Sequence, residues 1–412
     1  MRRREGLGLA LYNPRLMTSA LQVREPLFTS RFVMLWAYAF ITFFSAFQLL
    51  PAIPFRILEL GGSRAEAGWF LSVYTFASAF AAPLMGNVAD QVGRRRLLVI
   101  ASVLFIGFSF AYGAIRQLPL LLVVGAIHGA IWSAILSSAS AIMSEFIPES
   151  RRTQGFAYWG LASTGAMAIA PAAGLYIFRF GWATLCNELA ALSIVMAIWA
   201  LLLPVSHTPL PQGITRMSES WDWRVIRVTL SLTVAAFGYG GMMTYAAILA
   251  IERHVSPPSI YLTVYAISLV LFRICFSHLG DRLGPKRMLY PSLVLVPIAF
   301  FILAVAHQRW QMVLSAAIFG VGFGGAYPAF VSFVLEHTDA SRRARTFGSI
   351  VWAFDTGIGT GSLLVGAIGQ RLGLGTAFAA AAALSCFSIP IFAWTSAHLV
   401  DSREQTSTAP SS

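Results

Sequence analysis

Long apolar runs separated by short polar segments make up most of the chain. A helix that crosses a bilayer needs about 20 mostly apolar residues, and the sequence offers twelve runs of that kind. They fall at about 31–56, 66–88, 97–115, 118–143, 154–178, 182–204, 226–250, 259–279, 287–306, 310–335, 346–369 and 374–398. The pattern predicts an all-α membrane protein with twelve transmembrane helices.

One longer polar segment separates the first six runs from the last six. It extends from Pro204 to Arg224 and contains Pro209, Pro211 and Gly213, which are typical of a linker. We therefore expect an N-terminal arm over 1–30, a six-helix half over 31–204, a linker over 205–224, a second half over 225–398 and a tail over 399–412.

The positive charges lie mainly in every second loop, counting along the chain. If both termini are cytoplasmic, the cytoplasmic segments hold 21 of the 29 Lys and Arg residues and the outer loops hold 7, with Arg273 inside a span. Cytoplasmic loops of membrane proteins are enriched in Lys and Arg. We therefore expect both termini in the cytoplasm and a multi-pass location in the inner membrane.

Composition supports the same class and excludes others. Hydrophobic residues make up 57% of the chain and charged residues 11%, against about 45–50% and about 25% in soluble domains. The net charge of +12 is carried by short clusters between apolar runs, so we expect no nucleic-acid partner. The sequence shows no metal-ligand spacing, phosphate-binding loop or catalytic motif, so we expect neither a metal or cofactor nor an enzyme.

Several segments of the first half recur in the second half 191 residues later. Three clusters in one register indicate an internal duplication. Parallel six-helix repeats are typical of transporters that bind a solute near the midplane, between the two halves. The recurring residues are Asp90 and Gly93 with Asp281 and Gly284, Glu145 with Glu336, and Arg151 and Arg152 with Arg342 and Arg343.

The loop between the second and third predicted spans carries the strongest motif. It reads GNVADQVGRR from Gly86 to Arg95 and resembles the GxxxDRxGRR motif of the major facilitator superfamily, with Gln91 in place of the usual Arg. The second copy keeps Arg282 but lacks the leading Gly. The resemblance covers all twelve spans. It implies the two-half fold of that family, in a bacterial secondary transporter that moves a small molecule by alternating access.

The resemblance also implies a latch on the cytoplasmic side. Gly86 would let the second span approach a helix of the other half closely, and Asp90 would face the N-terminus of the eleventh span. Glu145 and Glu336 would join inter-loop ion pairs. The expected gate residues are Gly86, Asp90, Gly93, Arg94, Arg95, Glu145, Arg151, Arg152, Asp281, Arg282, Gly284, Glu336, Arg342 and Arg343.

Two further motifs of the family are altered. In the fourth span, Gly125 stands where the family often has an Arg linked to proton coupling. The fifth span departs from the exporter pattern GPxxGG, although Pro171 and Gly174 still permit a bend and close packing. We expect proton-coupled efflux of an amphipathic or drug-like molecule. Uptake of a sugar, carboxylate or other metabolite by symport or uniport, and a non-transporting membrane sensor, are the alternatives.

Ionisable groups inside membrane spans are candidates for the site because each costs at least about 2.5–3.5 kcal/mol to insert. Asp355, His128, Glu188 and Arg273 lie in predicted spans. Each also has a structural interpretation, which is an ion pair, a buried core histidine, a packing hydrogen bond and a snorkelling side chain, respectively. Polar and aromatic cavity walls are expected from Gln48, Trp132, Tyr239 and Tyr245. The expected partners are a small-molecule substrate, the lipid bilayer and protons, bound by a monomer.

Overall fold

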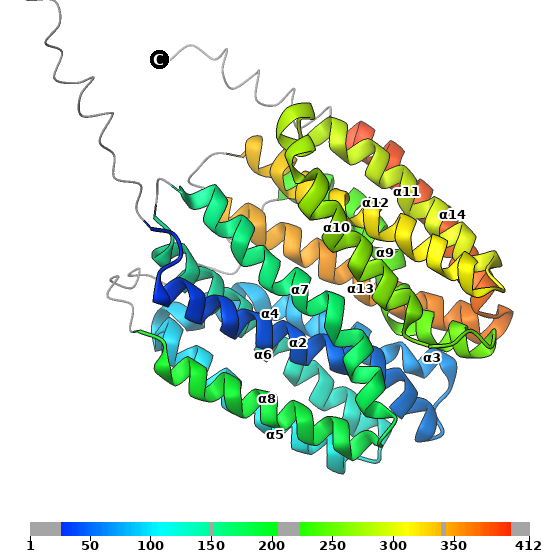
Figure 1. Cartoon of the computed structure of the whole chain (residues 1–412), viewed down its shortest axis with the longest axis horizontal. Helices are drawn as coiled ribbons and strands as arrows, with labels where there is room; N and C mark the ends of the chain where they lie inside the picture. Colours follow the sequence, from blue (N-terminus) through cyan, green and yellow to red (C-terminus); the bar gives the residue numbers. More distant parts are fainter. Residues whose placement is uncertain (1–25, 149–150, 205–222, 339–342, 397–412) are drawn as a thin grey trace, which may run out of the picture.

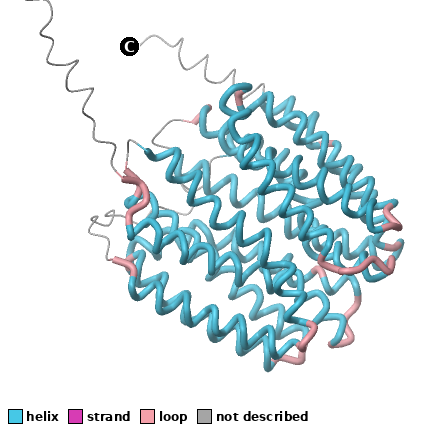
Figure 2. The backbone as a smooth tube through the Cα atoms, in the orientation of Figure 1, coloured by secondary structure: helices cyan, strands magenta, loops and turns pink. Residues whose placement is uncertain are grey.

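The computed structural model describes residues 26–148, 151–204, 223–338 and 343–396. Within these residues every regular element is a helix (Figure 2). Twelve helices are long, and the four-residue helix α3 (Arg64–Ala67) precedes the second of them.

The first six long helices form the N-half. They are α2 (Ser30–Glu59), α4 (Trp69–Val92), α5 (Arg94–Ala114), α6 (Leu118–Phe146), α7 (Arg152–Phe178) and α8 (Trp182–Leu202). The C-half contains α9 (Trp223–Glu252), α10 (Ile260–Leu283), α11 (Pro285–Val305), α12 (Arg309–Glu336), α13 (Arg343–Leu372) and α14 (Leu374–Cys386). After a turn at Phe387, helical residues continue over 388–396.

Ten of these helices are long and apolar enough to cross a membrane. The other two are α4 and α10, each of which includes side chains outside the described set. The spans are apolar on most of their circumference because lipid covers one side of a membrane helix and other helices cover the rest.

The predicted boundaries of the helices agree with the structure to within a few residues. Most of the predicted arm, linker and tail lies outside the described residues, at 1–25, 205–222 and 397–412. The end of the predicted linker needs a correction, because residues 223 and 224 already belong to α9. The short helix α3 was not expected from the apolar pattern.

The same three helix pairings occur in both halves. In the N-half α2 packs on α7, α4 on α6 and α5 on α8; in the C-half α9 packs on α13, α10 on α12 and α11 on α14. Figure 1 shows the two groups of helices side by side, with α3 at one end of the bundle. The repeated pairings agree with an internal duplication of six helices.

Two equivalent glycines explain why the repeated loop motif has a Gly three residues after its Asp. Gly93 connects α4 to α5 with φ of 98°, and Gly284 connects α10 to α11 with φ of 81°. A residue with a Cβ rarely adopts this left-handed conformation. Glycine therefore allows each helix pair to be joined through a single residue.

The two halves meet along a surface that we call the seam. It is formed where α13 packs on α3 and α4, where α10 packs on α7, and where α2 approaches α9. The end of the bundle at which Arg64–Ala67 lie is called the α3 end below. The seam is where a rocking motion of the halves would make and break contacts.

Candidate functional site

An acidic side chain of the C-half crosses the seam near the middle of the bundle. Asp355 lies in the central part of α13, and its Oδ2 accepts a hydrogen bond from the Ser78 hydroxyl of α4 at 3.0 Å. A hydrogen bond to an ionised group is roughly twice as strong as a neutral one. The strength of this contact between the halves therefore depends on whether Asp355 carries a proton.

A basic side chain of the C-half crosses the seam at a second place. Arg273 lies in the central part of α10, and its Nη1 donates to the Thr164 hydroxyl of α7. Its Nε donates to the backbone oxygen of Gly324 in α12 at 3.5 Å. Arg273 thus ties the N-half to two helices of the C-half.

Aromatic side chains surround these two charges. Tyr327 of α12 lies within electrostatic reach of both Asp355 and Arg273, and its ring centroid is 4.9 Å from that of Phe354. Tyr239 of α9 stacks on Phe323 at 4.8 Å. Asp355 and Arg273 bond to hydroxyl groups of the N-half rather than to each other, so the acid, the base and the rings form one polar and aromatic region at the seam.

His128 occupies a different environment, inside the N-half. Its Nδ1 is 2.9 Å from the Tyr112 hydroxyl, and its Nε2 is buried without a partner. The rings of Phe105 and Tyr74 pack against it at 4.3 and 5.1 Å. His128 is 5% exposed, so the aromatic core separates it from solvent.

Gln48 and Glu188 also meet inside the N-half. The Gln48 amide of α2 donates to the Glu188 carboxyl of α8 at 3.0 Å. Trp132 of α6 packs edge-on against Phe43 at 5.1 Å. These three candidates contact residues of their own half.

Tyr245 belongs to a closure of the seam at the α3 end. Its hydroxyl donates to the backbone oxygen of Arg64 at 2.8 Å. The Arg64 guanidinium forms an ion pair with Glu252 of α9 at 2.8 Å, and the Arg64 backbone N–H donates to Gln370 of α13 at 2.9 Å. One residue of α3 is therefore bonded to both α9 and α13.

The short helix that presents Arg64 is held by a capping box. The Ser63 hydroxyl accepts from the backbone N–H of Glu66, and the Glu66 carboxylate accepts from the backbone N–H of Ser63 at 2.7 Å. The hydrogen bond from the Ser63 backbone N–H to the carboxylate lowers the pKa of Glu66. The capping box fixes the start of a helix too short to be stable alone.

Close backbone contacts across the seam are found at the α3 end. A Cβ added to Gly68, which joins α3 to α4, would lie 2.4 Å from the Ser362 backbone oxygen of α13, and one added to Gly366 of α13 would lie 3.2 Å from the backbone oxygen of Ala65 in α3. In contrast, a Cβ on Gly86 or Gly348, at the other ends of α4 and α13, would meet no atom of the described residues within 4 Å. In this conformation the halves are pressed together at the α3 end, and the close approach expected at Gly86 stays a prediction.

The loop motif makes an ion pair and hydrogen bonds within the N-half. The Arg94 guanidinium donates to the Glu145 carboxylate at the end of α6. Arg95 donates to the backbone oxygens of Ala200 and Leu201, which lie at the C-terminal end of α8. Basic side chains bind such free helix carbonyls favourably, so the motif ties α5 to α6 and α8.

Of the remaining expected gate residues, only two have side chains within the described set. Arg151 is half-buried at the start of α7, and Glu336 is exposed at the end of α12. Arg342 and the side chains of Asp90, Arg152, Asp281, Arg282 and Arg343 lie outside the described residues. The latch across the seam therefore stays a prediction.

The altered motif of the fifth span lies where α7 meets α2. Pro171 is inside α7. A Cβ on Gly174 would lie 2.6 Å from the backbone oxygen of Gln48. Gly174 thus permits the close packing that the sequence predicted, within the N-half.

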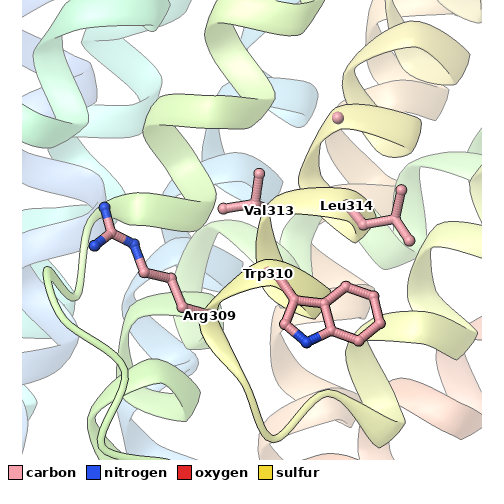
Figure 3. Close-up of a pocket in the computed structure, with 5 residues that line it drawn as sticks. Arg309, Trp310, Val313 and Leu314 are labelled. Atoms are coloured by element: carbon pink, nitrogen blue, oxygen red, sulfur yellow. The ribbon is translucent and has the colours of Figure 1, made fainter.

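An open hollow of about 630 Å³ lies away from these groups, at the start of α12. It is lined by Arg309, Trp310, Val313, Leu314 and Ala317, and Figure 3 shows Trp310 and Leu314 projecting from the same side of the helix. Exposed Trp and Arg side chains at the end of a span are typical of the membrane–water boundary. The hollow is therefore a surface feature, not the central site.

Sequence reasoning missed the residues of the N-half that complete the seam. Ser78 and Thr164 are ordinary polar residues within apolar spans, and Arg64 is a charge in a short loop. A hydroxyl residue near the midpoint of a span is the one signal that could have identified Ser78 and Thr164. Within the described residues, no group of three or more His, Cys, Asp or Glu side chains could hold a metal ion.

Comparison with protein families gives a match along nearly the whole chain. The model of the Major Facilitator Superfamily matches residues 35–251 and again residues 228–411.

Curated relatives include two named for drug resistance or export. The quinolone resistance protein NorA of Staphylococcus aureus is 21% identical over 314 residues, covering 73% of this chain and 80% of NorA. The multidrug export protein EmrB of Haemophilus influenzae is 26% identical over 154 residues, covering 37% of this chain and 30% of EmrB. An uncharacterized MFS-type transporter of Burkholderia mallei is 25% identical over 88% of this chain and 91% of its own length.

Solved transporter structures share the fold. The nucleoside transporter NupG aligns with a TM-score of 0.72 at 18% identity, covering 89% of this chain and 99% of NupG. A POT family transporter in complex with 5-aminolevulinic acid aligns with a TM-score of 0.74 at 14% identity, covering 89% of this chain and 96% of that protein. At these identities the likeness concerns the fold alone.

Proposed function

Since the chain belongs to the Major Facilitator Superfamily and is a multi-pass membrane transporter rather than an enzyme, we propose that it exports an amphipathic or drug-like molecule in exchange for protons. The transporter acts as a monomer in the bacterial inner membrane, with both termini in the cytoplasm. In this orientation the α3 end faces outward. The present conformation is therefore one in which the outer side is closed.

The observation that carries the proposal is the hydrogen bond from Ser78 to Asp355 across the seam. When Asp355 is ionised, its charge strengthens the bond between α4 and α13. When Asp355 takes up a proton, the charge is lost and the bond weakens. Uptake of a proton thus favours separation of the two helices, which is the coupling that an antiporter needs.

The surroundings of Asp355 favour an amphipathic substrate. Tyr327, Tyr239 and Phe354 present aromatic faces beside the two charges, and such rings bind apolar bodies of different shapes. A polar group on the substrate can compete with Ser78 for Asp355 or with Thr164 for Arg273. When the substrate binds Asp355, binding of substrate and binding of a proton at that carboxyl are mutually exclusive, as exchange requires.

Energised inverted vesicles test this proposal, with a dye that reports proton movement across a panel of amphipathic and drug-like solutes. Asp355→Asn keeps the size of the side chain but removes its charge and its exchangeable proton. We expect a solute-triggered proton flux in the wild type and at least a tenfold loss in Asp355→Asn. Thr233→Ala is the matched control, because the Thr233 hydroxyl bonds to Ala353 of α13 within the C-half, and it should retain the flux.

The direction of transport follows from the same vesicles. Exporters load solute into inverted vesicles, whereas an uptake system empties them. Proton flux that is unchanged in Asp355→Asn would contradict the coupling role of Asp355. Loading without any proton flux would contradict exchange with protons.

A further inference from the structure

A second buried polar pair lies inside the N-half, apart from the charges at the seam. Gln48 of α2 is 0% exposed, and Glu188 lies about two turns into α8. The Gln48 Nε2 donates to Glu188 Oε1 at 3.0 Å. The exchange cycle described above makes no use of this pair.

One oxygen of each side chain is left without a hydrogen bond. Gln48 Oε1 and Glu188 Oε2 are both buried, and neither has a partner. A buried polar atom without a partner costs about 1–3 kcal/mol, and more when the group is charged. Both atoms are acceptors when Glu188 is ionised, so they cannot satisfy each other.

A single proton on Glu188 can provide a hydrogen bond for both unpartnered oxygens. The two oxygens of Glu188 share one carbon, as do the oxygen and nitrogen of the Gln48 amide, so two planar groups that already share one hydrogen bond can close a ring with a second. A proton on Glu188 Oε2 makes that oxygen a donor. It can then donate to Gln48 Oε1 and complete the paired arrangement of an amide and a carboxylic acid.

Within the part of the chain that the structure describes, no ion pair compensates an ionised Glu188. The ion pairs found in the described part of the chain join Arg56 to Glu59, Arg64 to Glu252 and Arg94 to Glu145. A carboxylate inside a span that lacks a cationic partner is costly. The neutral acid avoids that cost.

The titratable groups on the elements packed around this part of α8 are engaged elsewhere. Arg56 of α2 bonds to Glu59 and lies 5.8 Å from the ring of Trp182. The Tyr112 hydroxyl of α5 bonds to His128, and Arg179 after α7 lies 5.0 Å from the ring of Tyr176. Cys186, on α8 itself, is a buried free thiol.

We propose that Glu188 and Gln48 form a proton-binding site, and that Glu188 is a neutral carboxylic acid in this conformation. The proton comes from water and returns to water, so binding converts one carboxylate into one carboxylic acid and forms one new hydrogen bond. The existence of the site does not depend on the proposed exchange. Its use in transport rests on the proposed function.

Infrared spectroscopy of the purified full-length protein at neutral pH tests the site without any transport assay. A protonated carboxyl group has a C=O stretching band that a carboxylate lacks. We expect Glu188→Gln to remove a band of that kind. Asp355→Asn, the matched control at the seam, should leave that band in place. A Glu188→Gln spectrum that overlays the wild type throughout this region would overturn the proposal.

Gln48→Leu supplies a second test that keeps the acid. Loss of the amide removes the acceptor of the Glu188 proton, so the band should move to higher frequency as the carboxyl group loses its hydrogen bond. An unmoved band would overturn the pairing even if Glu188→Gln fails to fold. Because these spectra need no substrate, they can support the site when the exchange assay fails, and the exchange assay can succeed when they do not.

Discussion

At the scale of single residues, small side chains determine how closely the helices pack. A Cβ on Gly361 of α13 would lie 1.8 Å from the backbone oxygen of Phe237 in α9. No adjustment of a side chain relieves a clash with backbone, so α9 and α13 would have to move apart. Helix packing in membranes depends on such small residues because lipid gives no hydrophobic drive for helices to associate.

Gly361→Ala should therefore destabilise the C-half. Overpacking in a close-packed interior costs about 1–3 kcal/mol, which should lower the midpoint of thermal unfolding of the detergent-purified protein. Gly348→Ala is a matched control on the same helix, because its Cβ would meet no described atom within 4 Å. The control should unfold at or slightly above the wild-type temperature, since Ala favours a helix by about 1 kcal/mol over Gly. Equal midpoints for the two variants would contradict the close contact of α9 and α13.

At the scale of elements, the connection between the first two spans holds the two halves together at the α3 end. Helix α3 comes from the N-half, and its residue Arg64 contacts α9 and α13 of the C-half through Tyr245, Glu252 and Gln370. All of these contacts lie at the end where glycines bring the halves together. Opening of this end therefore requires that α3 release Arg64 from both helices.

Tyr245→Phe should shift the protein toward a conformation open at the α3 end. Loss of one hydrogen bond of about 1 kcal/mol changes the equilibrium roughly fivefold. Spin labels at positions 116 and 308, exposed on opposite halves, should report a larger population at long distance. Tyr261→Phe is the control, because it removes a hydrogen bond to Ser315 within the C-half. Identical distance distributions in the two variants would exclude a role of Tyr245 in closing this end.

The elements also show what sequence patterns can and cannot predict. Apolar length placed the ends of the spans within a few residues, and the repeated Asp and Gly identified equivalent connections, because both are local properties of the chain. The partners of Asp355 and Arg273 could not be predicted. A span that is apolar all round does not reveal which face meets the other half, so the contacts of Ser78 and Thr164 emerge only from the packing of the helices.

At the scale of the whole molecule, two halves of like construction meet along a seam with an acid and a base at its centre. The α3 end is closed by Arg64 and its partners, while the charged loop motif holds α5, α6 and α8 together within one half. Two halves that are each held by internal contacts can rock about their common surface. We propose that protonation of Asp355 couples this motion to the movement of solute.

The most direct test uses purified protein in liposomes, with a solute identified in the vesicle panel. One assay imposes a pH gradient and measures accumulation of the solute; the other measures exchange of labelled for unlabelled solute without a gradient. We expect the wild type to perform both, and Asp355→Asn to retain exchange but lose accumulation driven by the pH gradient. Accumulation by Asp355→Asn at the wild-type level would contradict the claim.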